Sequence, residues 1–324
     1  MNEKKFKVVF TDYDYPDIEI EKESGGIMMI KEKLSGVFVP AITPFVNDEI
    51  QYDKLEFNIR KLNETSIRGY LVLGSNGENK SLTHDEKLKV LEVFIKNKED
   101  KVIMAGTGCE STKETISFSI QATDLGADFV SVLTPSYFAK QIKDEILIDY
   151  YKEIAESIKV PMLIYNAPSF AGGVKISPKT ASKLAEHPNI VGMKDSSTDG
   201  IMGFLAATRD VKDFCVIAGS ANFFLTGLMC GATGGILSLA NAFPEKCCEL
   251  YEAFKKGDIE QSIKLHFELF YLNSKVSGAG GVSGVKASAT IAGYFGGEPR
   301  RPLKPINDSQ LEEMKKVFIE KGLI

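Results

Sequence analysis

Eight short apolar runs alternate along the chain with longer segments of helical period, beginning near residue 36. The runs cover residues 37–42, 70–73, 102–105, 129–133, 162–165, 190–194, 214–218 and 235–239. Each run ends in or beside Gly, Ser, Thr, Asn or Pro, as strands that lead into loops do. Eight strand and helix pairs in this order predict an α/β protein, a closed (β/α)₈ TIM barrel with parallel strands.

The helical segments carry their own start signals. They include residues 53–64, 84–96, 111–125, 143–157 and 177–187. Thr83 and Ser111 are placed to cap helices that have a glutamate in the first turn, and Ser177 stands before a proline suited to the first helical position. These local signals support the strand and helix alternation.

The strand pattern stops near residue 257, and helical patterns continue at residues 259–272 and 309–321. A glycine-rich link is expected between them at residues 278–284. We therefore predict an N-terminal appendage (residues 1–33), a barrel (34–257) and a C-terminal helical extension (258–324). The appendage combines an apolar run at residues 7–10 with an acidic stretch at 12–19, which does not continue the barrel pattern.

Composition narrows the class of protein. The 324 residues are 44% hydrophobic and 26% charged, which is typical of a globular protein, and no apolar run approaches the roughly 18 residues that span a bilayer. The charged N-terminus is followed by an acidic stretch where a signal peptide needs an apolar one, so we expect a cytoplasmic protein. The net charge is -5 and the basic residues are dispersed, so neither a membrane nor nucleic acid is the expected partner.

Metal and cofactor chemistry find little support in the sequence. The five cysteines (Cys109, Cys215, Cys230, Cys247 and Cys248) form no CxxC pair, which favours reduced thiols over a disulfide framework or a zinc site. The three histidines lie in polar, helix-like stretches. A nicotinamide dehydrogenase, suggested by the opening residues, lacks its GxGxxG turn, because residues 106–111 have no third glycine. We expect no cofactor and no metal.

The strongest chemical candidate is Lys194, which ends the apolar run at 190–194. Active sites of such barrels lie at the C-terminal ends of the strands. Burial disfavours the ammonium form of a lysine, and a neutral amine can attack a ketone to form a Schiff base. Tyr165 ends the preceding strand and is the expected proton shuttle.

A turn rich in glycine follows the second predicted strand, at Gly74-Ser75-Asn76-Gly77-Glu78. Backbone amides in such a turn can hold a carboxylate, and Ser75 and Asn76 add a hydroxyl and an amide. An ordinary connection between strand and helix is the alternative interpretation. The turn is the candidate site for the carboxylate of a 2-oxo acid.

Four motifs at four strand ends resemble those of the dihydrodipicolinate synthase and N-acetylneuraminate lyase family of class I aldolases. They are Gly74-Ser75-Asn76-Gly77-Glu78, Thr134-Pro135-Ser136-Tyr137, Tyr165-Asn166-Ala167-Pro168 and Gly192-Met193-Lys194-Asp195. The resemblance covers roughly residues 34–324.

The resemblance implies roles for individual residues. Lys194 would form the Schiff base, Tyr165 would relay protons with Ser75, and Tyr137 would complete the relay, from a neighbouring subunit of a homotetramer or homodimer. The implied substrate-binding residues are Ser75, Asn76, Phe170, Ser196, Gly219 and Ile236. The substrate would be pyruvate or a related 2-oxo acid, together with an aldehyde.

The second substrate is less closely determined. Phe170 stands where dihydrodipicolinate synthases have an arginine that grips aspartate semialdehyde, and residues 106–112, 187–196 and 293–297 look closer to 4-hydroxy-2-oxoglutarate aldolases. We therefore favour that branch at this stage. A 4-hydroxy-tetrahydrodipicolinate synthase with Lys80 or Lys140 as a substitute cation, a sugar-acid lyase and a non-catalytic pyruvate-binding scaffold are the alternatives. In the favoured branch, Ser196 could donate a hydrogen bond to the far end of the substrate.

Overall fold

The computed structural model describes residues 30–197 and 199–324. Most of the predicted appendage, including the expected strand at residues 7–10, lies outside the described residues. The first described element is the short helix α1 (Ile30–Lys33).

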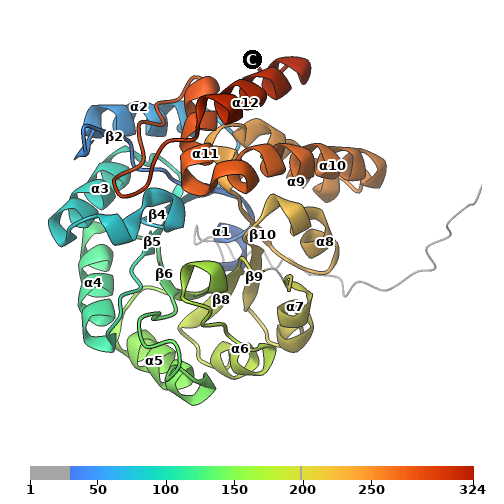
Figure 1. Ribbon diagram of the computed structural model, residues 1–324. Coiled ribbons are helices and arrows are strands. Elements are labelled where there is room, and N and C mark those ends of the chain that lie inside the picture. Colours follow the sequence, from blue (N-terminus) through green and yellow to red (C-terminus); the bar gives the residue numbers. More distant parts are fainter. Residues whose placement is uncertain (1–29, 198) are drawn as a thin grey trace, which may run out of the picture.

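Eight parallel strands close into a barrel (Figure 1). They are β1 (Gly36–Pro40), β4 (Gly69–Val72), β5 (Val102–Gly106), β6 (Phe129–Leu133), β7 (Met162–Asn166), β8 (Ile190–Asp195), β9 (Cys215–Ala218) and β10 (Gly234–Ile236). Consecutive strands are neighbours, and β1 closes the ring by pairing with both β4 and β10. The predicted TIM barrel is confirmed. A two-stranded hairpin, β2 (Phe45–Val46) with β3 (Glu49–Ile50), lies outside the ring.

Helices surround the barrel, and one follows each strand. They are α2 (Tyr52–Asn63), α3 (His84–Asn97), α4 (Thr112–Leu125), α5 (Asp144–Ser157), α6 (Pro178–Ala185), α7 (Met202–Thr208), α8 (Phe224–Met229) and α9 (Pro244–Lys255). The expected caps are confirmed. Thr83 forms a capping box with Glu86, and the side chains of Ser111 and Ser177 each accept a backbone hydrogen bond at the start of a helix.

The strands are apolar throughout because both of their faces are covered. One face packs against the surrounding helices. The other face fills the barrel interior with Phe38, Leu71, Val102, Met104, Phe129, Leu163, Val191, Cys215, Ile217 and Ile236. Leu34 and Ile30 join this interior cluster from the N-terminal side, and α1 is seen inside the ring of strands in Figure 1. The active site is therefore expected at the opposite, C-terminal end.

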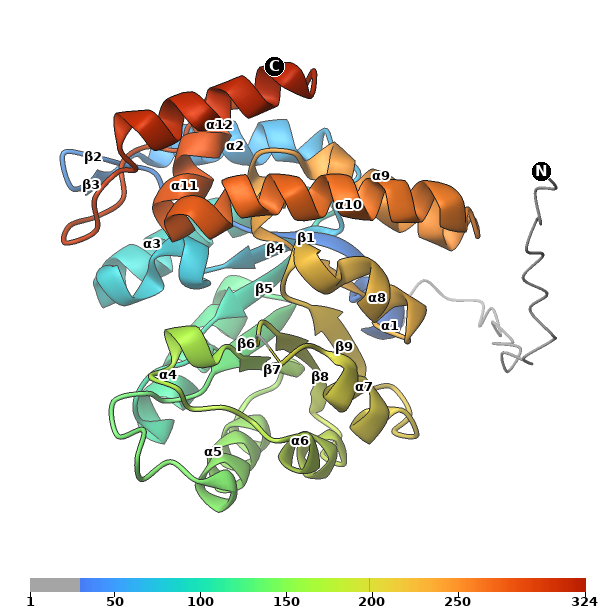
Figure 2. The ribbon, with the colours of Figure 1, turned by 45° about the vertical axis from the view of Figure 1, so that its right-hand side comes forward.

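Three helices form the C-terminal extension, and they lie together with α2 and α9 on one side of the barrel (Figure 2). They are α10 (Ile259–Lys275), α11 (Ser277–Ile291) and α12 (Asp308–Glu320). The glycine-rich link predicted at 278–284 is much shorter than expected, because these residues belong to α11, in which two helices meet at a kink. Only Gly281 interrupts that helix among its described residues, with φ 53° and ψ -133°.

The last predicted strand is shorter than expected. Its C-terminal half, including Leu239, belongs to the 3₁₀ helix η5 (Ser238–Asn241). Further 3₁₀ turns follow other strands, namely η1 (Ser75–Gly77), η2 (Asn79–Ser81), η3 (Pro168–Phe170) and η4 (Ala221–Phe223). Four of these five turns, all but η2, begin within three residues of a strand end and so shape the C-terminal mouth of the barrel.

Candidate active site

Lys194 and Tyr165 lie side by side at the ends of two paired strands. The register of β7 and β8 pairs these two residues directly. Both are buried, with 4% of Lys194 and 5% of Tyr165 exposed. The Nζ atom of Lys194 lies 4.2 Å from the centre of the Tyr165 ring. The two residues singled out from the sequence therefore meet in one enclosed place.

The hydroxyl group of Tyr165 is the centre of a polar cluster. Burial opposes its ionisation, yet the pKa of Tyr165 lies below its usual value. The positive charge of Lys194 and side-chain hydrogen bonds with Ser75, Ser196 and Lys194 outweigh burial. A phenol whose pKa is lowered in this way is better suited to exchange protons with a reacting group. Four predicted site residues thus come together.

The predicted carboxylate-binding turn contains η1. Ser75 begins this 3₁₀ helix, and the turn closes through hydrogen bonds from Gly77 N to Gly74 O and from Glu78 N to Ser75 O, each 3.1 Å. The side-chain amide of Asn76 donates to Ser238 Oγ at 2.8 Å. Ser238 begins η5 beyond β10 and was not singled out from the sequence, although it lies two residues after Ile236.

Gly219 and Ile236 occupy the ends of the next two strands. Ile236 is 1% exposed and belongs to the interior cluster. Gly219 N donates to Asp195 O at 2.7 Å, and Ser196 Oγ donates to Gly219 O at 3.4 Å. A Cβ atom at Gly219 would lie 2.0 Å from Ser196 Oγ, so a side chain there would collide with a predicted substrate-binding residue.

Buried polar groups also surround Asp195, the residue that follows Lys194. Asn166 Nδ2 donates to Asp195 Oδ1 at 2.7 Å, and Ser197 Oγ donates to Asp195 Oδ2 at 2.9 Å. Asn166 Oδ1 accepts the backbone N–H of Ile176 at 3.0 Å. Burial raises the pKa of Asp195, and the hydrogen bonds from Asn166 and Ser197 oppose that shift. Asn166 and Asp195 stand in the sequence motifs, but no role could be assigned to them without these contacts.

Tyr137 and Phe170 do not join this cluster. Tyr137 is 81% exposed and contacts the Phe138 ring edge to face at 5.0 Å. Among residues 30–197 and 199–324, no hydrogen bond or ring contact connects Tyr137 with Tyr165 or Lys194. The carboxylate of Glu110 fixes the loop by accepting the backbone N–H groups of Ser136 and Tyr137. Tyr137 is therefore presented to the outside.

Phe170 lies in η3 and is 54% exposed. The two lysines considered as substitutes for the missing arginine are exposed as well. Lys80 donates to the carbonyl oxygen of Gly108 at 3.1 Å, which ties it to a loop. The described contacts give Lys140 no comparable anchor.

The described part of the chain offers no obvious metal site. No group of three or more His, Cys, Asp or Glu side chains in it is arranged to hold a metal ion. All five cysteines are free thiols, and burial raises the pKa of Cys109 and Cys215 to about 11. None of the helices in the same residues is long and apolar enough to cross a membrane.

Comparison with known proteins identifies relatives over nearly the whole barrel and extension. The model of the Dihydrodipicolinate synthetase family matches residues 33–321. A 4-hydroxy-tetrahydrodipicolinate synthase of Methanopyrus kandleri is 34% identical over 298 residues, which is 90% of this chain and 98% of the relative. The enzyme of the same name from Methanospirillum hungatei is 36% identical over 87% of this chain and 98% of its own length.

Solved structures lead to the same group. The chloride-inhibited dihydrodipicolinate synthase of Acinetobacter baumannii, solved in complex with pyruvate, superposes with a TM-score of 0.84 and is 29% identical. The match covers 90% of this chain and all of that one. The similarity therefore includes the C-terminal helices as well as the barrel.

Proposed function

Since the chain belongs to the dihydrodipicolinate synthetase family and is a lyase of that family, we propose that it is a class I aldolase in which Lys194 forms a Schiff base with pyruvate or a related 2-oxo acid. The observation that supports this most directly is the buried lysine beside Tyr165 on paired strand ends. A buried strand-end lysine next to a proton donor has the surroundings that amine catalysis needs.

The proposed reaction begins when the neutral amine of Lys194 attacks the ketone carbon of the 2-oxo acid. The carbonyl oxygen receives protons and leaves as water, and an iminium remains. Loss of a proton from the neighbouring methyl carbon gives an enamine, which attacks the aldehyde carbon and forms the new carbon–carbon bond while the aldehyde oxygen takes up a proton. Water then hydrolyses the regenerated iminium, which releases the product and frees the amine of Lys194. Tyr165 carries the protons, and its lowered pKa and its hydrogen bond with Ser75 fit that role.

The substrate carboxylate is assigned to the turn that holds Ser75 and Asn76. Gly219 and Ile236 would leave room for the substrate at the mouth of the barrel, and Ser196 would face its far end. Tyr137 would complete the relay in the site of a second copy of the chain, in a homodimer or homotetramer. The exposure of Tyr137 supports that assignment. A tyrosine that relays protons in an enclosed site must be covered, and a second copy of the chain would cover this one.

For the second substrate, the relatives favour the synthase over the 4-hydroxy-2-oxoglutarate aldolase that the motifs favoured. The relatives compared above are named 4-hydroxy-tetrahydrodipicolinate synthase, which favours condensation of pyruvate with aspartate semialdehyde. Cleavage of 4-hydroxy-2-oxoglutarate remains the second candidate because Phe170 replaces the arginine that would grip the semialdehyde carboxylate. Loss of one charge-assisted contact costs about 1.5–3 kcal/mol, or roughly 10- to 150-fold in efficiency.

Two measurements on one preparation separate these possibilities. Borohydride added with pyruvate should reduce the iminium and leave a covalent adduct on the Lys194 peptide, which mass spectrometry detects. An unmodified peptide from an enzyme that turns over would overturn the Schiff-base mechanism, and an adduct without turnover of any aldehyde would favour a binding scaffold. Condensation with aspartate semialdehyde is then compared with release of pyruvate from 4-hydroxy-2-oxoglutarate. The more efficient reaction identifies the branch.

A further inference from the structure

A buried cation from the C-terminal extension reaches the turn assigned to the substrate carboxylate. Lys286 lies on α11, and its side chain is 1% exposed. Its Nζ atom donates to a carboxylate oxygen of Glu78 and to the carbonyl oxygen of Glu298, and it lies 4.4 Å from the centre of the Phe45 ring. The side chain of Glu78 is 2% exposed. Lys286 and Glu78 therefore form an ion pair that water hardly reaches.

Glu78 ends the turn in a conformation that residues with a side chain rarely adopt. Its φ of 53° and ψ of 37° lie in the left-handed region. Both oxygens of its carboxylate are held by the C-terminal extension, since Oε1 accepts from Lys286 and Oε2 accepts the backbone N–H of Arg300 at 2.8 Å. Strained backbone of this kind persists where the surroundings fix it, and here the fixing contacts come from the extension.

The rest of the turn is held from the barrel side. Thr43 Oγ1 donates to Gly77 O at 2.8 Å, and Asn76 donates to Ser238. Helix α11 packs against both η1 and η5, the two turns that the Asn76 contact joins. Glu78 therefore adds an anchor from the extension to a turn that Thr43 and Ser238 hold on its other side, and its backbone N–H donates to Ser75 O.

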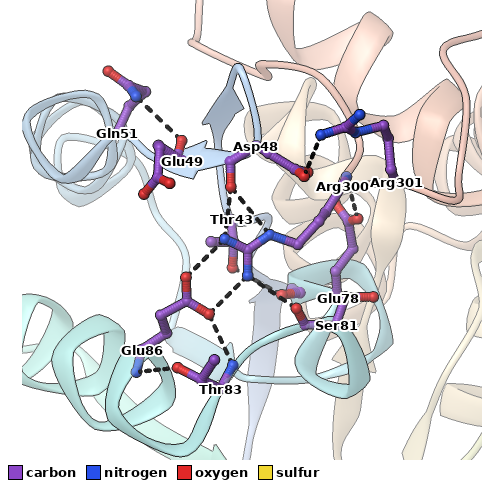
Figure 3. A network of polar contacts seen from close by, with 11 residues as sticks. Thr43, Asp48, Glu49, Gln51, Glu78, Ser81, Thr83, Glu86, Arg300 and Arg301 are labelled. Carbon is purple, nitrogen blue, oxygen red and sulfur yellow. Dashed lines mark hydrogen bonds and ion pairs between the residues drawn. The ribbon is translucent and has the colours of Figure 1, made fainter.

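The charges around Lys286 make the ion pair sensitive to pH. Burial lowers the pKa of Lys286 to about 8, and the negative charges of Glu78 and Glu298 oppose this while Arg300 adds to it. Figure 3 shows how Arg300 itself is occupied, with its guanidinium group bonded to Glu86 and to the carbonyl oxygens of Asp48 and Ser81. Arg300 is committed to these partners and does not replace Lys286 as the cation of Glu78.

We propose that Lys286 is a positioning residue of the active site: its ion pair with Glu78 holds the turn so that Ser75 and Asn76 face the substrate carboxylate beside Lys194. The inference rests on the proposed function, because that function assigns the carboxylate to this turn. Lys286 acts through Glu78 and not on the reacting atoms. Loss of Lys286 should therefore weaken the binding of pyruvate strongly and slow the chemical step only slightly.

The test measures how borohydride trapping on Lys194 depends on pyruvate concentration, in the parent protein and in variants. In Lys286→Met, the pyruvate concentration for half-maximal trapping should rise about 10- to 100-fold, the effect expected of a misplaced binding group. The trapping rate at saturating pyruvate should fall much less.

Lys61→Met is the matched control. Lys61 lies 4.4 Å from the centre of the Tyr294 ring and donates to the carbonyl oxygens of Ala292 and Gly293, so it also joins the barrel to the extension. Within residues 30–197 and 199–324, Lys61 makes no hydrogen bond or ring contact with the turn at residues 74–78. This variant should keep the half-maximal concentration of the parent.

Lys286→Met leaves a buried carboxylate without its cation and can unfold for that reason. The double variant Glu78→Gln/Lys286→Met removes both charges, and its melting temperature shows whether it folds. Weakened pyruvate binding in a folded double variant supports the proposal. Half-saturation equal to that of the parent in the folded double variant overturns it.

The pH dependence gives a second test in which the folded double variant is the reference. Half-saturation by pyruvate should worsen with rising pH more in the parent than in Glu78→Gln/Lys286→Met, because only the parent has a Lys286 with a lowered pKa. Identical pH profiles for the two proteins overturn the positioning role. Absence of any Lys194 adduct in the parent protein at neutral pH would instead reject the proposed function. The two failures are therefore distinguishable.

Discussion

Replacing Tyr165 with phenylalanine removes one oxygen atom from the proposed active site and leaves the aromatic ring in place. The ring keeps its contact with the Lys194 ammonium group, which lies 4.2 Å from the ring centre. The change removes the hydroxyl whose pKa is lowered by the charge of Lys194 and by the nearby side chains of Ser75 and Ser196. A positioned acid or base contributes about 10²- to 10⁴-fold to a rate, which is about 3–5 kcal/mol of the barrier. We expect turnover to fall by that factor.

The effect on stability should be smaller. Each lost hydrogen bond is worth about 0.5–1.5 kcal/mol, so the free energy of unfolding should fall by no more than a few kcal/mol. Tyr151→Phe is the control, because Tyr151 is an equally buried tyrosine whose hydroxyl donates to Val132 O at 3.0 Å, away from the proposed site. That variant should lose about 1 kcal/mol of stability and keep its turnover.

The assay follows pyruvate-dependent turnover and the rate of borohydride trapping at saturating pyruvate, with denaturant unfolding measured on the same samples. Tyr165→Phe should slow both rates while Tyr151→Phe slows neither. A Tyr165→Phe protein that turns over as fast as the parent would refute the relay assignment. The Lys194 mechanism would then need another proton carrier.

Three further outcomes are expected. Gly219→Ala should abolish most activity and lower the melting temperature, because its Cβ would lie 2.4 Å from the backbone oxygen of Asp195 and 2.0 Å from Ser196 Oγ; a fully active variant would show that the strand ends can move apart. Ser75→Ala should raise the pyruvate concentration for half-maximal rate and also lower turnover, and a change in neither would remove Ser75 from the site. Hydrogen bonding from Arg300 holds the pKa of Glu86 below its usual 4.5 despite partial burial, so the parent should be more stable than Glu86→Gln above pH 4.5. Acid unfolding should show this advantage shrinking as pH falls below 4.5, and a constant difference would contradict it.

The sequence was sufficient for the barrel because its strands are buried on both faces. Such strands read as unbroken apolar runs, and the loops between them carry turn residues. Their order then places Tyr165 and Lys194 on neighbouring strands, since consecutive strands of this barrel pair directly. That is why the centre of the candidate site could be predicted from two strand ends.

The sequence predicted a link over the glycine-rich residues 278–284, where α11 has only a kink, and this difference has a physical reason. Glycines lower helix propensity and usually mark loops. Here two of them permit close packing, because a Cβ on Gly284 would lie 2.2 Å from Val276 O and a Cβ on Gly280 would lie 2.4 Å from Ile306 Cγ2. Gly281 between them keeps the non-helical backbone that only glycine readily adopts, so one glycine makes the kink while its neighbours permit close packing. No single-sequence pattern distinguishes these two uses of glycine.

Contacts between distant parts of the chain could not be predicted from the sequence either. Asn76 and Ser238 are 162 residues apart, and Glu78 and Lys286 are 208 apart. The sequence around Lys286 gives no sign that this lysine is buried, since most lysines are exposed. The place of Tyr137 in a second copy of the chain stays a prediction, because a single chain does not test it.

The contacts of the extension explain why a barrel enzyme of this kind would keep helices beyond its eighth strand and helix pair. Strand pairing fixes Lys194 and Tyr165 directly. The turn proposed to bind the carboxylate lies in a loop, and Glu78 in that loop adopts strained backbone. Arg300 joins the start of α3, through Glu86, to the hairpin carbonyl of Asp48, as Figure 3 shows. On this proposal, the position of the nucleophile depends on the barrel, and the binding of the substrate carboxylate depends on the extension. Changes in the C-terminal helices should accordingly alter pyruvate affinity while the amine chemistry of the strand ends persists.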